Sequence, residues 1–260
     1  MEEIEYYNKA KQYLLSFDSV TNDMLNAQID EWKNRKSTTI SDLFKALLLH
    51  AQNRQGMPNS IGDIEKLSSL LFEFDHIKVH ESYSDWEMLF DAIVSSDYNP
   101  PGRMLKTNNK SHWVIYCKSI ISIAEFLSSY EKVEDFNAFV NGFLTNEQSK
   151  LALPLLLSKE IFGFGFALAC DFLKENISPQ FIKPDTHIND IAFGVGITSS
   201  KKDYTIFKDV EAYCTRIGVL PYAVDKVFWL VGSGNFYLSG IKINSSKHEF
   251  IKAINGSKVA

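Results

Sequence analysis

The 260-residue sequence lacks the features that define several classes of protein. It has three cysteines, Cys117, Cys170 and Cys214, which lie far apart in apolar surroundings and which we expect to be reduced core residues. Their spacing fits neither a zinc site nor a four-cysteine iron–sulfur cluster. No apolar run approaches the roughly 18 residues of a membrane span, and the acidic start, MEEIEYYNKAKQ, is unlike a signal peptide. We therefore expect a cytoplasmic protein with no membrane partner.

The sequence also lacks the positive charge of a typical nucleic-acid binder, because its net charge is −5. The charge is uneven, however: residues 1–100 hold 9 Lys/Arg against 17 Asp/Glu, and residues 101–260 hold 18 against 15. No acid occurs between Asp97 and Glu125. The basic residues of that stretch are Arg103, Lys106, Lys110 and Lys118. From charge alone, a phosphate-binding surface and a solvated charged loop are equally good interpretations.

Apolar residues recur at helical spacing through most of the chain, which predicts an all-α fold. The clearest predicted helices cover residues 84–96, 111–129, 134–143, 146–160, 204–216 and 222–233. Ser60 is also predicted to cap a helix whose inward face carries Ile61, Ile64, Leu67, Leu70 and Leu71.

The most informative stretch is residues 159–197, KEIFGFGFALACDFLKENISPQFIKPDTHINDIAFGVGI. It predicts a helix end, a Gly163-Phe164-Gly165 turn and a second helix to about residue 176. Gly163 and Gly165 are residues that can take backbone angles closed to other side chains. After a proline-containing loop, Asp185 comes directly before another apolar helical run.

This arrangement resembles the helix-hairpin-helix DNA glycosylases, a superfamily of base-excision enzymes. Residues 161–165, Ile-Phe-Gly-Phe-Gly, stand where that family has Leu-Pro-Gly-hydrophobic-Gly, and residues 184–188, Pro-Asp-Thr-His-Ile, match its Val-Asp-Thr-His-Val segment. Ala167 and Asp185 are eighteen positions apart, which is the family's usual interval. The resemblance implies a two-lobed, all-α, glycosylase-like fold with an extra N-terminal helical segment.

The resemblance also implies a DNA contact at the hairpin, through Gly163, Phe164, Gly165 and Phe166. From their charge, the basic residues Arg103, Lys106 and Lys110 are expected to add to this contact. Unpaired N–H groups and the dipole at the start of the second helix would bind a phosphate. In the family, hairpin carbonyls hold a monovalent cation that bridges to phosphate, and no other cofactor is expected. The alternative is a helix–turn–helix corner that needs small residues only for packing.

Asp185 takes the place of the family's catalytic carboxylate. Cleavage of a base from deoxyribose builds positive charge on the sugar, which a carboxylate stabilises while it activates water. The alternative is a purely structural helix cap. Bifunctional members carry a Schiff-base lysine where this chain has Ala167, and Lys159 and Lys183 are off that position. We therefore expect a monofunctional glycosylase.

Other residues are placed by the resemblance alone. Tyr98 and Asn99 stand where the family inserts a side chain into the DNA stack. His187 and Trp229 are expected to line a cleft between the lobes that holds the extruded base, with Asp185 at its mouth, although Trp229 is also a typical core residue.

The expected domains are an N-terminal helical region, 1–82, and a glycosylase-like region, 83–260, with the hairpin at 159–176 and with the two chain ends sharing one lobe. Double-stranded DNA is the expected partner of a monomer that works at the nucleoid. The excised base stays open among an alkylated purine, an oxidised purine, a mismatch and a phage-type modified base. The alternative functions are a non-catalytic helix-hairpin-helix module that binds DNA or protein, and a helical scaffold protein.

Overall fold

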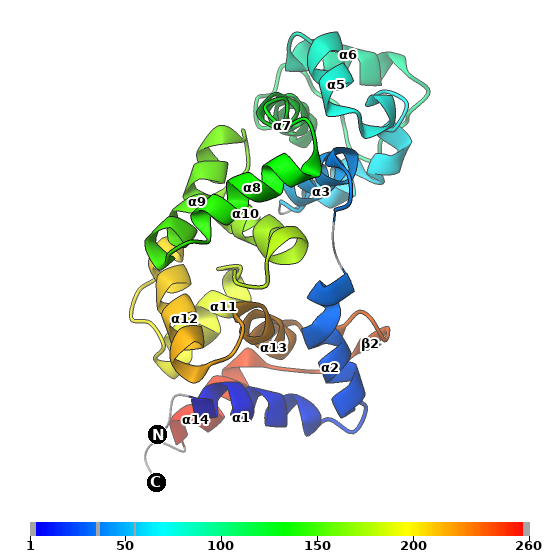
Figure 1. The fold of residues 1–260 in the computed structure, drawn as a ribbon. Helices are drawn as coiled ribbons and strands as arrows, with labels where there is room; N and C mark the ends of the chain where they lie inside the picture. Colours follow the sequence, from blue (N-terminus) through cyan, green and yellow to red (C-terminus); the bar gives the residue numbers. More distant parts are fainter. Residues whose placement is uncertain (1–3, 35–36, 55, 257–260) are drawn as a thin grey trace. The chain divides into compact units, whose positions relative to one another are not determined.

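The computed structural model describes residues 4–34, 37–54 and 56–256 (Figure 1). It is predominantly helical, and its one strand pair in these residues is β1 (Asn235–Phe236) antiparallel to β2 (Ile241–Lys242). The all-α prediction is therefore confirmed. The chain forms two compact units, which we describe separately: unit 1 combines the residues up to 36 with those from 173 onward, and unit 2 is residues 37–172.

Unit 2 is organised around α7 (His112–Leu127), which packs against α3, α4, α5 and α6. Apolar residues occur on nearly all sides of α7, as expected for a helix enclosed by others. The other helices of the unit are α3 (Ile40–Gln52), α4 (Met57–Ile61), α5 (His76–Ser82), α6 (Trp86–Ser95), α8 (Val133–Phe143), α9 (Glu147–Glu160) and α10 (Phe166–Phe172), with the 3₁₀ turns η2 (Ile64–Leu67) and η3 (Phe72–Phe74). Helix α10 packs against both α9 and α3, which fixes the hairpin to the body of the unit.

Unit 1 is organised around α13 (Pro221–Ser233), which packs against α1, α2, α11, α12 and α14. Almost every α13 side chain is buried, including the charged pair Asp225 and Lys226. The other helices are α1 (Ile4–Leu15), α2 (Asn22–Asp30), α11 (Thr186–Val195), α12 (Asp203–Ile217) and α14 (Lys247–Gly256), with the 3₁₀ turn η1 (Glu31–Asn34) and the π-helical turn η4 (Leu173–Ile177).

The boundary predicted between residues 82 and 83 is not a boundary between the two units. That point lies between α5 and α6, and both helices pack against α7 within unit 2. Shared burial against one central helix therefore joins segments that the sequence analysis had separated.

The prediction of a helix that starts at Ser60 is wrong. Gly62 ends α4 with φ +77° and ψ −150°, and Asp63 then caps the short turn η2 through its side chain. Residues 72–74 follow in a left-handed conformation, with φ between 51° and 62°. Most of the apolar residues predicted to face inward are nevertheless buried, so their spacing correctly indicated burial but not the backbone.

Candidate functional site

Asp185 in unit 1 lies half-buried at the start of α11. Its Oδ1 accepts hydrogen bonds from the N–H groups of His187 (2.8 Å) and Ile188 (3.1 Å), so the carboxylate caps the helix. Its Oδ2 makes no hydrogen bond with any residue that the structure describes. One oxygen thus holds the carboxylate in place, and the second is available to a ligand.

Helix α13 supports the segment that carries Asp185. The Asp225 carboxylate accepts a hydrogen bond from the Lys183 N–H through Oδ2 (2.7 Å), two residues before Asp185. Two residues after it, the His187 ring lies against Gly232, where an added Cβ would come within 2.3 Å of Nδ1. In the sequence Trp229-x-x-Gly232, the glycine is therefore the residue that lets α13 approach the first turn of α11 closely.

His187 and Trp229 are both partly exposed in unit 1. The buried His187 Nδ1 has no hydrogen-bond partner among the described residues, whereas the Trp229 ring makes an edge contact with Tyr237, at 5.9 Å between centroids. Each retains an accessible part, as a lining residue needs.

A network of buried charges lies behind the Asp185 segment. Lys174 Nζ is 2.6 Å from Asp225 Oδ1 and 3.1 Å from Glu175 Oε1. Lys226 Nζ is 3.2 Å from the same Glu175 oxygen and 3.5 Å from Glu31 Oε2. We call these five residues the buried ionic cluster. Tyr222 and Tyr237 add hydroxyl contacts to Glu175 and to Glu31 and Lys226, respectively.

Burial shifts the titration of this cluster. It raises the pKa of Asp225, a shift that the Lys174 ammonium opposes and that the negative charge of Asp185 reinforces. Burial also lowers the pKa of Lys226. Perturbed buried groups of this kind are common at functional sites, although structural ion networks produce them too.

The buried ionic cluster was not predicted, although the sequence carries a signal for it. Lys174-Glu175 and Asp225-Lys226 are charged pairs inside apolar helical runs, where charges are buried only if paired. The first pair lies in the π-helical turn η4, a type of turn that often occurs at functional sites. A cavity of about 50 Å³, lined by Trp32 and residues 174–179, adjoins it.

In unit 2, the hairpin places its two glycines differently. Gly163 has φ +73°, and a Cβ there would meet Ser119 Oγ at 2.9 Å. Gly165 has no left-handed backbone, and a Cβ there would meet nothing within 4 Å. The carbonyl of Gly165 accepts the N–H groups of Leu168 and Ala169, so this residue starts α10. Gly163 is required by the turn itself, whereas Gly165 leaves the surface open.

The aromatic residues of the hairpin do not share one role. The Phe164 ring is 1% exposed and packs against Phe172. Contrary to the expectation, its side chain is therefore not accessible to DNA. Phe166 is half-buried. Phe162, which the sequence analysis did not select, is 48% exposed. Buried and exposed positions alternate across the turn, which explains why Phe162 is exposed and Phe164 is buried.

The hairpin carbonyls are largely occupied. The Ile161 oxygen accepts the Phe164 N–H, the Phe162 oxygen accepts the Ser119 hydroxyl, and the Gly165 oxygen accepts two helix N–H groups. Three of the hairpin carbonyls are thus hydrogen-bonded within the protein, and the monovalent cation stays a prediction. Within the described residues, no group of three or more His, Cys, Asp or Glu side chains is placed to hold a metal ion.

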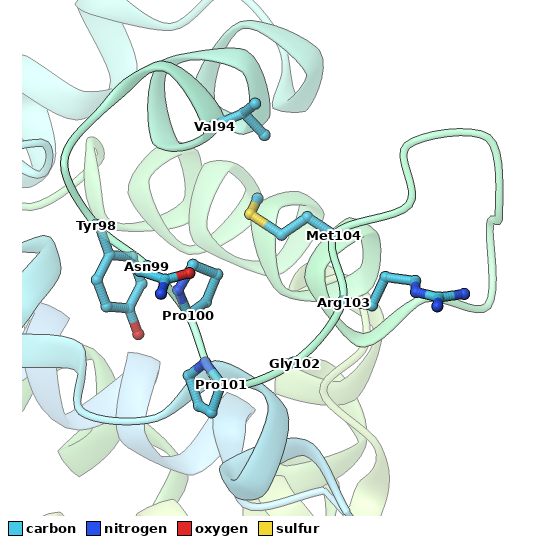
Figure 2. Close-up of a pocket in the computed structure, with 8 residues that line it drawn as sticks. All are labelled: Val94, Tyr98, Asn99, Pro100, Pro101, Gly102, Arg103 and Met104. Atoms are coloured by element: carbon cyan, nitrogen blue, oxygen red, sulfur yellow. The ribbon is translucent and has the colours of Figure 1, made fainter.

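The loop after α6 borders an open pocket of about 430 Å³, lined by Val94 and residues 98–104 (Figure 2). The Tyr98 hydroxyl is bonded to the Ile61 carbonyl, and its ring makes an edge contact with Trp113. Asn99 is exposed. Of the two residues expected to enter DNA, Tyr98 is therefore engaged within unit 2, and Asn99 is accessible.

The three basic residues expected to contact phosphate also differ. Lys106 forms an ion pair with Asp91 (2.6 Å) and lies 3.6 Å from Glu87. The hydrogen bond to Asp91 is the main cause that raises the pKa of Lys106. Arg103 and Lys110 are exposed, and Arg103 extends away from Tyr98 and Asn99 (Figure 2). Lys106 is thus neutralised by its neighbours, while Arg103 and Lys110 remain accessible.

No protein-family model, curated protein or solved structure matches this chain. None of the helices in the described part of the chain has the length and hydropathy that crossing a membrane requires.

Proposed function

We propose that the protein is a monofunctional DNA glycosylase that hydrolyses the N-glycosidic bond of an extruded base. The observation that carries this proposal is Asp185, whose Oδ1 is fixed by two backbone N–H groups while Oδ2 stays without a hydrogen bond. The resemblance of residues 161–165 and 184–188 to the helix-hairpin-helix glycosylases supplies the reaction class.

In the proposed hydrolysis, the Asp185 carboxylate acts on the sugar and on a water molecule. Positive charge develops on the sugar as the bond to the base nitrogen breaks, and the bonding electron pair leaves on the base. The Asp185 carboxylate stabilises that charge and takes a proton from a water molecule, whose oxygen bonds to C1′. The departing base gains a proton from solvent, and Asp185 returns the proton taken from water to solvent, so the products are the neutral free base and an abasic hydroxyl on the DNA. Lys183, Asp225 and Gly232 act indirectly, by positioning the segment that holds Asp185.

The hairpin contributes to binding through its backbone. A Cβ at Gly165 would meet nothing within 4 Å, so the backbone there can come close to a phosphate. Arg103 and Lys110 supply exposed charge for phosphate. Asn99, rather than Tyr98, is the residue suited to fill the gap in the DNA stack.

The test is release of bases from duplexes that carry different lesions, compared between the wild type and Asp185→Asn. Asparagine caps a helix about as well as aspartate, so the melting temperature stays the same while base release falls about 10²- to 10⁴-fold. Asp85→Asn is the matched control, because Asp85 caps α6 through the same two-bond geometry. This control keeps full base release.

Two results contradict the proposal. Equal base release by the wild type and Asp185→Asn leaves Asp185 as a cap only. Efficient trapping of a covalent adduct by borohydride contradicts the monofunctional mechanism, because Ala167 offers no amine.

The capping bonds of Asp185 also favour a second candidate, a non-catalytic helix-hairpin-helix module that binds DNA. Its signature is duplex binding with no base release from any lesion.

A further inference from the structure

Three elements of unit 2 bring a lysine and two aromatic rings together beside the hairpin turn. Lys118 Nζ, from α7, lies 4.8 Å from the centroid of Trp86 at the start of α6. It also lies 5.6 Å from the centroid of Phe162 in the turn. We call these three residues the Phe162 surface. None of them belongs to the site proposed for base excision.

The backbone under Phe162 is fixed. Its N–H donates to Ser122 Oγ (2.9 Å), and its carbonyl accepts from Ser119 Oγ (2.9 Å). The Ser122 hydroxyl in turn donates to the Glu160 carbonyl (3.1 Å). Both serines project from α7, so the turn is held by hydrogen bonds and does not depend on the Phe162 ring. A ring that is 48% exposed on a fixed backbone is preorganised for contact with a ligand.

The charge beside this ring is positive. Lys118 lies in the stretch from 98 to 124 that has no acid, and the described residues form no ion pair with it. The acid closest in sequence to Phe162 is Glu160. Burial raises the pKa of Tyr130, and the charge of Glu160 adds to that shift, so this carboxylate interacts with Tyr130.

An exposed ring beside a cation matches the chemistry of single-stranded nucleic acid. A base stacks on an aromatic ring, and a lysine binds the adjoining phosphate. A duplex keeps its base faces covered by stacking, so it offers no face to the ring. A protein partner fits less well, because a charge at the centre of a small aromatic patch is unfavourable in the core of a protein interface.

We propose that Phe162, Lys118 and Trp86 form a docking surface for an unpaired nucleobase and its adjoining phosphate. The surface lies in unit 2 and does not need the chemistry of Asp185. Failure of base excision therefore does not contradict this proposal, and failure of this proposal does not contradict base excision.

The experiment measures binding of the full chain to a fluorescein-labelled oligothymidylate of about 12 nucleotides at low salt, by fluorescence anisotropy. Phe162→Ala is expected to weaken binding about tenfold, because one stacked base is lost. Phe162→Trp is expected to restore it. Lys118→Gln is expected to weaken binding and to reduce the slope of log affinity against log salt by about 0.7, the value for one phosphate contact on a single strand.

Phe193→Ala is the matched control. Phe193 in unit 1 is 45% exposed and has Lys201 Nζ 5.4 Å from its ring centroid, so it has the same local chemistry away from the hairpin. This variant is expected to bind like the wild type. Urea unfolding of Phe162→Ala, expected to match that of the wild type, checks that the turn survives.

Several outcomes overturn the proposal. These are no binding of the oligonucleotide by the wild type, equal losses in Phe162→Ala and Phe193→Ala, or binding of a duplex that depends on Phe162 as strongly as binding of the single strand. Self-association that Phe162→Ala abolishes, without oligonucleotide binding, assigns the surface to a second copy of the chain. An oligoribonucleotide of matching sequence distinguishes a DNA from an RNA source of the same chemistry.

Discussion

At the scale of single residues, burial decides what a polar group can do. His76 lies almost fully buried at the start of α5, next to the Phe44 ring, while His80 one turn later is exposed. Burial lowers the pKa of His76, and His80 adds to this effect. Asp75 and backbone carbonyls of Tyr130 and Leu127 oppose it. Burial therefore disfavours the charged form of this ring in the folded state.

This arrangement predicts an acid-sensitive step in stability. The folded-state pKa of His76 lies below the unfolded value of about 6.5, so the unfolded chain binds the proton first as pH falls. The free energy of unfolding consequently drops as pH falls below that value, down to the folded-state pKa. His76→Phe is expected to reduce this drop in urea unfolding between about pH 7.5 and 5.5. His248→Gln, at an exposed histidine of unit 1, serves as the control and should leave the drop intact. The same drop in His76→Phe assigns it to another group.

At the scale of the element, the two glycines of the hairpin separate folding from contact with a ligand. Gly163 has a left-handed backbone and touches Ser119, whereas Gly165 has neither constraint. The turn thus needs one glycine for its shape and has a second one where the surface is open.

We predict that Gly163→Ala lowers the free energy of unfolding by at least about 1–2 kcal/mol, because alanine is strained in this region and meets Ser119 Oγ. Gly165→Ala is the control for stability and should unfold at the wild-type urea concentration. If backbone at Gly165 approaches phosphate, as the proposed function requires, Gly165→Ala nevertheless weakens duplex binding. Unchanged duplex affinity in that variant argues against the proposed approach.

The positions of several helices could be predicted from the sequence. The helical spacing located α6, α7, α8, α9, α12 and α13 to within about two residues, which is the usual uncertainty of helix ends. The region 57–74 could not be predicted in the same way. Gly62 and the left-handed residues 72–74 interrupt a sequence whose buried positions still follow helical spacing, so periodicity reports burial and not continuity.

The candidate site was predictable where local chemistry defines it. Asp185 is a helix cap, a role that its position before an apolar run indicates. Phe164 and Lys106 were not predictable, because the Phe172 ring that covers one and the Asp91 carboxylate that neutralises the other come from other elements. For the buried ionic cluster, the adjacent charged pairs indicate buried charge locally. Their meeting with each other and with Glu31 depends on segments that are far apart in the chain, which no local pattern reports.

At the scale of the whole molecule, the chain leaves unit 1 and later returns to it. The buried ionic cluster shows what this return builds: Glu31 comes from the first segment, and Lys174, Glu175, Asp225 and Lys226 come from the second. The charges of the two units also differ. Residues 37–172 hold 11 Lys/Arg against 17 Asp/Glu, so DNA contacts in unit 2 rely on local positive charge rather than on the net charge of the unit.

We predict that Lys174→Met lowers the free energy of unfolding by about 3–5 kcal/mol, because it leaves the Asp225 carboxylate buried without its partner. Adding Asp225→Leu removes that unpaired charge. The double variant is therefore expected to lose less stability than the sum of the two single variants, as measured by urea unfolding in a double-mutant cycle. Additive losses contradict direct coupling between these two side chains.

The discontinuity of unit 1 has a consequence for biosynthesis. Residues 4–34 leave the ribosome well before their native partners, which begin only at residue 173, about 140 residues later, a delay on the order of ten seconds at ordinary translation rates. During that delay unit 2 is completed, while Ala10, Leu14 and Leu25, all fully buried in the finished protein, have no native core to join. The nascent N-terminal helices are thus the part of this chain that depends most on chaperones that shield apolar surface.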